Sequence, residues 1–147
     1  MTEFKIKPDP ARTFYWEVEI YPSVTALRKA PHPHGGSLKG YRDMLACCYA
    51  GEKINCRGSR ARKMPYLGVI RFSKSHIGVG ILSHEVFHAT IGYLDRIGIK
   101  ALFRSGDGEW TTEDEEIAAR AQQNMMQQLV NALDQSGLLK RNIKGVV

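Results

Sequence analysis

The sequence predicts an α+β fold, in which a small β-sheet packs against long helices. Aromatic and β-branched residues gather in two stretches, residues 13–29 and 66–72, which is typical of strands. Two later stretches, residues 79–97 and 112–135, repeat apolar residues at the spacing of one helix face. Strands and helices alternate too little for a doubly wound parallel sheet, so we expect an α+β arrangement.

The N-terminal half is expected to contain strands, a loop and one helix. Residues 13–29 predict two strands, or one strand interrupted at Pro22, because proline lacks the N–H that a strand ladder needs. The residues that follow are rich in Pro and Gly and predict a loop. Ser37 is then expected to cap a helix over Leu38 to Ala50. A further strand is expected over Tyr66 to Phe72.

The C-terminal half is expected to consist of two helices joined by a loop. The first covers Val79 to Ile97 and is apolar on several sides, which is typical of a helix at the centre of a domain. The second covers Thr112 to Gln135, and Thr111 or Thr112 is suited to cap it. Its acidic start, residues 113–116, suits the positive end of the helix dipole. The expected element order is therefore β-β-α-β-α-α.

Length and composition limit the class of protein. A chain of 147 residues is long enough for one domain with a buried core but short for two, so we expect residues 1–147 to form a single domain. The sequence has no apolar run that could span a membrane, and its N-terminus lacks an apolar signal-peptide core. We therefore expect a cytoplasmic protein with no membrane partner. The odd cysteine count, with Cys47 and Cys48 adjacent and Cys56 nearby, predicts neither a disulfide framework nor a cysteine-based zinc site.

The net charge of +6 is carried by the first half of the chain. Its densest basic cluster is Arg57, Arg60, Arg62 and Lys63, which could bind phosphate groups or an acidic partner. The cluster has no interleaved aromatic residues that could stack on bases. A solvated basic loop is therefore the favoured interpretation, and nucleic acid is only a weakly indicated partner.

The stretch "SHEVFHAT" places two histidines within the first long helix of the C-terminal half. His84 and His88 are four residues apart, so a helix brings both imidazoles to one face, where they could bind a zinc ion. Glu85 lies about 100° further round the helix, from where it could act as general base on a zinc-bound water. The alternative is that both histidines are structural and are satisfied by hydrogen bonds.

The acidic start of the last helix is the expected source of a third zinc ligand, because catalytic zinc usually has three protein ligands. Glu115 lies one turn before Ala118, on the flank of the helix face that carries the apolar residues. Asp114 is placed almost as well, and Glu113 and Glu116 stay open as alternatives. The competing explanation is that acidic residues are common at helix N-termini.

A resemblance follows from these motifs. H-E-x-x-H followed by Glu115-x-x-Ala118 resembles the gluzincin group of zinc metallopeptidases, and "LGVIRFSKSHIGVGILSHEVFHA" is similar to small phage or mobile-element metallopeptidases in the style of the ImmA/IrrE and SprT-like families. The resemblance covers about residues 66 to 133. It implies a zincin-like sheet packed on a central motif helix and a C-terminal helix. It also implies a cytosolic hydrolase that cleaves a protein or peptide substrate, with zinc held by His84, His88 and Glu115 and with Glu85 as general base.

The resemblance further implies how a substrate would bind. The strand "YLGVIRFSK" would be the edge strand that pairs with an extended peptide. Tyr66, His76 and Tyr93 are candidate donors to the oxyanion of a tetrahedral intermediate. Two alternatives stay open. One is a non-catalytic or degenerate zinc-binding module that holds an acidic partner or nucleic acid through the basic N-terminal half, and the other is a hydrolase acting on a non-peptide bond.

Overall fold

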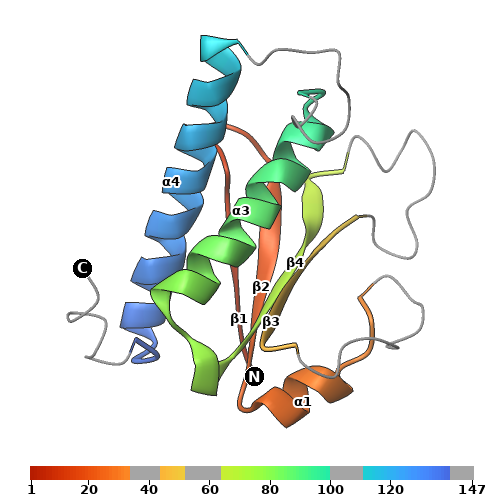
Figure 1. Cartoon of the computed structure of the whole chain (residues 1–147), viewed down its shortest axis with the longest axis vertical. Coiled ribbons are helices and arrows are strands. Elements are labelled where there is room, and N and C mark those ends of the chain that lie inside the picture. The colour runs from red at the N-terminus through yellow and green to blue at the C-terminus, as the bar shows by residue number, and fades with distance from the viewer. Residues whose placement is uncertain (34–43, 52–63, 100–110, 140–147) are drawn as a thin grey trace.

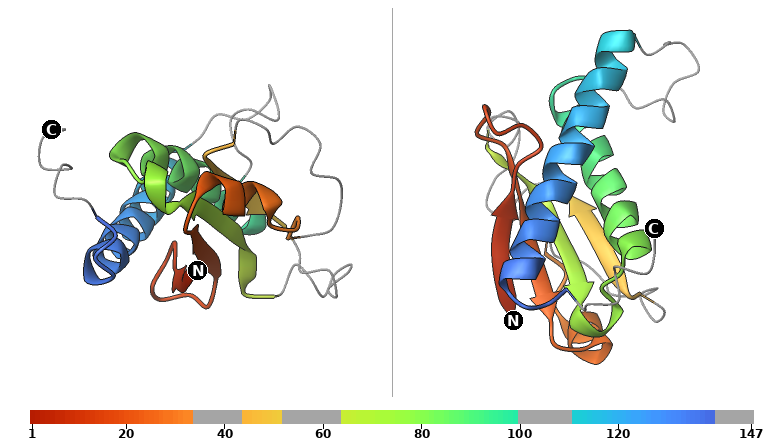
Figure 2. Two further views of the ribbon diagram at one scale, coloured as in Figure 1. Left: turned by 90° about the horizontal axis from the view of Figure 1, so that it is seen from below. Right: turned by 90° about the vertical axis from the view of Figure 1, so that its left-hand side faces the viewer.

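The computed structural model describes residues 1–33, 44–51, 64–99 and 111–139. Within these ranges the fold is mixed α+β, with four strands in one sheet and the two long helices on one of its faces (Figures 1 and 2). The strands are β1 (Thr2–Ile6), β2 (Tyr15–Tyr21), β3 (Ala46–Ala50) and β4 (Tyr66–Ser73). The helices are α1 (Val24–Lys29), the 3-10 helix η1 (Lys74–His76), α3 (Val79–Arg96) and α4 (Thr112–Gln135).

The sheet has the strand order β1-β2-β4-β3, which places β4 inside it. β4 runs parallel to β2 and antiparallel to β3, and all eight of its residues are buried. The prediction that this strand forms the sheet edge is therefore wrong. Its continuous apolar run is typical of a strand with neighbours on both sides. The edge on that side of the sheet, among the described strands, is β3.

Two further predictions in the N-terminal half are corrected, and one strand there was not predicted. Residues 46–50 form β3 rather than the end of a helix, because pairing with β4 supplies their backbone hydrogen bonds; the rest of the predicted helix lies mostly outside the described residues. The second half of residues 13–29 forms α1, capped by the Ser23 hydroxyl, which accepts from the backbone N–H of Ala26 at 3.1 Å. The sequence reasoning also missed β1, a short strand that pairs with β2.

Both long helices are confirmed, with boundaries within one residue of those predicted. Thr111 and Asp114 form a capping box at the start of α4, in which each side chain accepts from the other residue's backbone N–H at 3.1 Å. Near its middle, α4 is tied to the end of β1 by two hydrogen bonds between the Gln128 side chain and the Lys7 backbone. Across the described ranges, none of the helices combines the length and apolar character needed to cross a membrane.

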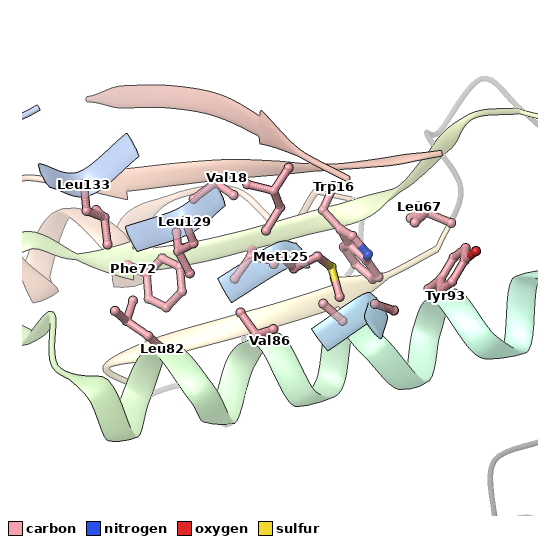
Figure 3. Close-up of a cluster of buried hydrophobic side chains, with 14 of the residues drawn as sticks. Trp16, Val18, Leu67, Phe72, Leu82, Val86, Tyr93, Met125, Leu129 and Leu133 are labelled. Carbon is pink, nitrogen blue, oxygen red and sulfur yellow. The ribbon is translucent and has the colours of Figure 1, made fainter. Parts of the chain in front are cut away.

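The core lies between the sheet and the two long helices (Figure 3). Leu82 and Val86 of α3 point into it, and Met125 of α4 reaches it from the other helix. Gly92 allows α3 to pack closely, because a Cβ there would lie 3.0 Å from the Trp16 ring. This contact lets α3 lie close to the sheet near Trp16, and further towards the start of the helix both motif histidines are exposed.

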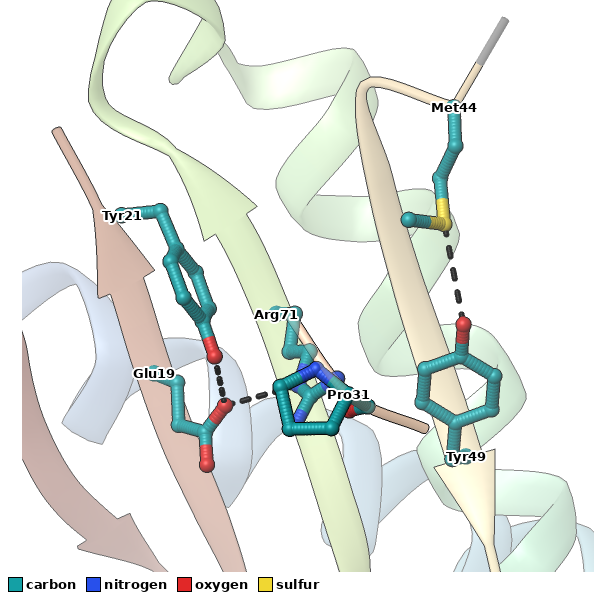
Figure 4. A network of polar contacts seen from close by, with 6 residues as sticks. All are labelled: Glu19, Tyr21, Pro31, Met44, Tyr49 and Arg71. Atoms are coloured by element: carbon teal, nitrogen blue, oxygen red, sulfur yellow. Dashed lines mark hydrogen bonds and ion pairs between the residues drawn. The ribbon is translucent and has the colours of Figure 1, made fainter. Parts of the chain in front are cut away.

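The opposite face of the sheet carries a polar network that fixes β2 against β4 (Figure 4). Arg71 Nε donates to Glu19 Oε2 at 2.7 Å, and Arg71 Nη1 donates to the carbonyl oxygen of Pro31 at 2.7 Å. The Tyr21 hydroxyl donates to the same Glu19 oxygen at 2.7 Å. Because Arg71 is buried, these contacts supply the hydrogen bonds that its guanidinium needs.

Candidate metal centre

Helix α3 brings His84 and His88 together on its exposed face. Their Nε2 atoms are 3.2 Å apart, and the ring centroids are 4.8 Å apart. Two imidazoles bound to one tetrahedral zinc, each at about 2.05 Å, would have nitrogens about 3.3 Å apart. The pair is thus spaced like two ligands of a single zinc ion. The same separation also allows one ring to donate a hydrogen bond to the other.

The electrostatic surroundings of His88 favour the form that binds metals. Partial burial lowers the pKa of His88, and the neighbouring His84 lowers it further. A histidine coordinates a metal through a ring nitrogen that carries no proton. The lowered pKa therefore favours the neutral imidazole of His88, which can bind a metal, at neutral pH.

Glu85 lies beside this pair but is itself buried, with 7 % of its surface exposed. Burial raises the pKa of its carboxyl group above the usual value of 4.5, and only the charge of His84 opposes that rise. The carboxylate makes no hydrogen bond or ion pair with any other residue that the structure describes. The carboxylate oxygens of Glu85 are not among the buried side-chain atoms that lack a hydrogen bond, and Glu85 lines the cleft described below. The carboxylate is therefore available to a ligand rather than committed to a structural contact.

A cleft of about 420 Å³ opens next to Glu85 and His84. The first residue of β3 and the two residues before it form one wall, and the first two turns of α3 form the other. The lining residues are Met44, Leu45, Ala46, Gly80, Ile81, His84 and Glu85. The sequence did not single out the first five of these. Met44, Leu45 and Ala46 were expected to be helical, and Gly80 and Ile81 precede the motif within the helix that carries it.

Glu115 is not brought together with the two histidines. It lies exposed in the first turn of α4, and this end of α4 points towards the C-terminal end of α3 (Figure 1), whereas His84 and His88 lie in the N-terminal half of α3. Helix α3 also packs against both α4 and β3, and the cleft is on the β3 side. In the described ranges no third His, Cys, Asp or Glu completes a metal-binding group. Glu115 as a zinc ligand stays a prediction that this geometry does not support.

The other acidic residues at this helix start have different environments. Asp114 is engaged in the capping box, and Glu116 forms an exposed ion pair with Arg120 at 3.4 Å. The side chains of Glu113 and Glu115 make no hydrogen bond or ion pair with a described residue. Capping therefore accounts for Asp114, and the position of Glu115 in the first turn suits the positive end of the helix dipole.

The candidate oxyanion donors do not gather at the cleft. Tyr66 packs edge to face against Tyr15, at 6.0 Å between ring centroids, on the sheet face away from the helices. Tyr93 is buried against Phe14, on the side of α3 opposite the two histidines. His76 hydrogen bonds through Nδ1 to the Ser75 hydroxyl at 2.9 Å. Packing and local hydrogen bonds thus account for these three residues.

The remaining features singled out in the sequence are the three cysteines and the basic cluster. Cys47 and Cys48 are free thiols in β3, as expected. Burial raises the pKa of both, that of Cys47 to about 11. Cys56 and the cluster of Arg57, Arg60, Arg62 and Lys63 lie outside the described residues.

Comparisons with models of known protein families, with curated proteins and with solved structures found no match. The function proposed for this chain accordingly rests on the residues and geometry of the candidate site. The features that carry it are the spacing of the histidine pair, the buried Glu85 and the adjoining cleft.

Proposed function

We propose that this protein is a zinc-dependent metallopeptidase that cleaves a protein or peptide substrate in the cytosol. The observation that carries the proposal is the 3.2 Å separation of the His84 and His88 Nε2 atoms, with Glu85 beside them in the lining of the cleft. Residues 1–147 would then be one zincin-like domain, with α3 as the motif helix and α4 as the C-terminal helix. The mixed sheet and the two helices on one face are compatible with that arrangement.

Each residue of the site has a role in this proposal. His84 and His88 would bind zinc through Nε2. Bound zinc would supply a Lewis acid that polarises the scissile carbonyl and lowers the pKa of water. Glu85 would take a proton from the attacking water and deliver it to the leaving amine. Its raised pKa supports this role, because a proton acceptor works best when its pKa is near the working pH.

The substrate would bind along β3. This strand pairs with β4 on one side, and its other side is paired with no strand in the described part of the chain. An extended peptide can add to such an edge through backbone hydrogen bonds. The residues at the start of β3 line the cleft that also contains His84 and Glu85, so a peptide on this edge would pass the candidate site.

A non-catalytic zinc-binding module is the alternative function. The observation that favours it is that the described residues provide two zinc ligands and no third. In this alternative, the basic N-terminal half would hold an acidic partner or nucleic acid, and Glu85 would have no part in function.

Metal analysis combined with digestion of an unbiased peptide library separates the two functions. The zinc-loaded wild-type protein and the Glu85→Gln variant are incubated with the library, and new termini are identified by mass spectrometry. The peptidase proposal expects cleavage by the wild type alone, with equal zinc content in both proteins. Zinc binding without cleavage by the wild type would support the binding module instead.

A further inference from the structure

We propose that Ser75 is a second reactive centre of this protein, a nucleophile activated by His76 that accepts an acyl group from an activated ester. This inference is independent of the proposed peptidase function, because the reaction uses no metal. Neither residue lines the cleft beside His84 and Glu85. The pair belongs to η1, the short 3-10 helix between the end of β4 and the start of α3 (Figure 1).

Three side chains form a continuous chain of hydrogen bonds at η1. The hydroxyl oxygens of Ser73 and Ser75 are 2.8 Å apart, and the Ser75 oxygen lies 2.9 Å from Nδ1 of His76. A serine hydroxyl has one proton to donate. When Ser75 donates it to Nδ1 of a neutral His76, Ser73 must be the donor in the other bond. The Ser75 oxygen is then bonded to a base that can take its proton and to a donor that stabilises negative charge on it.

Both ends of η1 are anchored in the fold. Ser73 is the last residue of β4 and is buried. Beyond η1, Ile77 is half-buried and packs against the hydrophobic core. These two anchors limit the conformations of the three residues between them, Lys74–His76. A nucleophile and base that are already held in place lose less entropy on reaching the transition state.

The reacting atoms are open to a substrate. Ser75 and His76 are both exposed. Nε2 of His76 bonds to no residue in the described part of the chain, so the ring can carry its proton there while Nδ1 accepts from Ser75. Gly78 follows two residues later, and a Cβ at that position would meet no atom within 4 Å, which leaves open space next to η1.

The proposed step needs no reactant besides the ester. Ser75 Oγ attacks the carbonyl carbon of the ester, and the Ser75 proton passes to Nδ1 of His76. A bond forms between Oγ and the carbonyl carbon, and the bond between that carbon and the alkoxide oxygen breaks. The alkoxide takes the proton from His76 and leaves as an alcohol, so the products are acylated Ser75 and the free alcohol.

The test uses a fluorophosphonate probe, which reacts with activated serines and stays attached to them. Attack by Ser75 forms a bond between Oγ and phosphorus, fluoride leaves, and the proton passes to His76. The full-length wild type, Ser75→Ala, His76→Asn and the control Ser136→Ala are labelled in the presence of EDTA, and modified residues are identified by mass spectrometry. Ser136 is also exposed, but its hydroxyl donates to the carbonyl oxygen of Ala132 at 2.7 Å.

We expect the wild type and Ser136→Ala to be labelled at Ser75 at the same rate. His76→Asn should react about 100-fold more slowly or less, because the base is lost, and Ser75→Ala should not be labelled in η1. Ser73→Ala should slow the reaction by about 5-fold, because it removes one neutral hydrogen bond.

Equal rates of Ser75 labelling in the wild type and His76→Asn would overturn the proposal. It would also fail if Ser75 in the wild type reacted no faster than Ser136. Both outcomes leave the peptidase function intact, since EDTA removes zinc from every sample.

Discussion

The Nε2 atoms of His84 and His88 lie 3.2 Å apart on the exposed face of α3. One turn of helix separates the two residues, so the helix itself fixes this distance with little help from the rest of the fold. The arrangement does not depend on α4, whose acidic first turn points towards the other end of α3. Zinc binding should therefore depend on both histidines.

Replacing His88 by Ala should weaken zinc binding by about 100-fold or more, because it removes one of two ligands from the described site. The affinity is measured by competition with a coloured zinc chelator. His76→Ala is the matched control, since His76 is also exposed but hydrogen bonds to Ser75 instead. Equal zinc affinity in His88→Ala and the wild type would exclude the histidine pair as a metal centre.

Glu85→Gln should keep zinc affinity within a few-fold of the wild type and lower kcat by about 10² to 10⁴. The reason is that glutamine keeps the shape of the side chain but cannot accept a proton. Turnover is followed on a peptide identified from the library digest, with Glu116→Gln as a control for the loss of an exposed carboxylate. A Glu85→Gln protein that is as active as the wild type would remove Glu85 from the mechanism.

The two long helices could be predicted from the sequence because their signals are local. The apolar spacing of α3 and the Thr111–Asp114 capping box of α4 are contained within each helix, and both were located to within one residue. For the same reason, the pairing of His84 with His88 followed from their spacing alone. These features need no knowledge of what packs against the helix.

The sheet and the cleft could not be predicted in this way, because they depend on contacts between distant residues. Ala46–Ala50 has no strong periodicity, and it is a strand because β4 pairs with it. The position of β4 inside the sheet follows from its neighbours β2 and β3. Glu115 was predicted as a zinc ligand from the register of α4 alone. The register shows which face of α4 a residue lies on, but not how α4 is oriented relative to α3.

Replacing Arg71 by Met should lower the free energy of unfolding by about 3 kcal/mol, because it leaves Glu19 partly buried without its charged partner. The Arg71 side chain is 7 % exposed and that of Glu19 is 19 % exposed, so water screens this pair weakly. Stability is measured by urea denaturation. The control is Arg120→Met, which breaks the exposed Arg120–Glu116 pair and should change stability by less than about 0.5 kcal/mol. Similar losses in the two variants would contradict the network shown in Figure 4.

Cys47 should react slowly with iodoacetamide in the folded protein. Burial raises the pKa of its thiol from 9.0 to about 11, although the charge of Arg71 opposes the rise. The thiolate is the reactive form, so a thiol with that pKa is only about 0.1 % reactive at pH 8, against about 10 % for one with a pKa of 9. The rate should therefore increase about tenfold for each pH unit up to about pH 11.

The measurement uses a Cys48→Ser/Cys56→Ser protein, in which Cys47 is the remaining cysteine. Alkylation is followed by mass spectrometry between pH 7 and 10, with the same protein unfolded in guanidinium chloride as the control. The unfolded protein should react about 100-fold faster at pH 8, because its thiol regains an ordinary pKa and full access to the reagent. If folded and unfolded proteins react at the same rate, Cys47 does not lie in the buried position on β3 that places it beside Arg71.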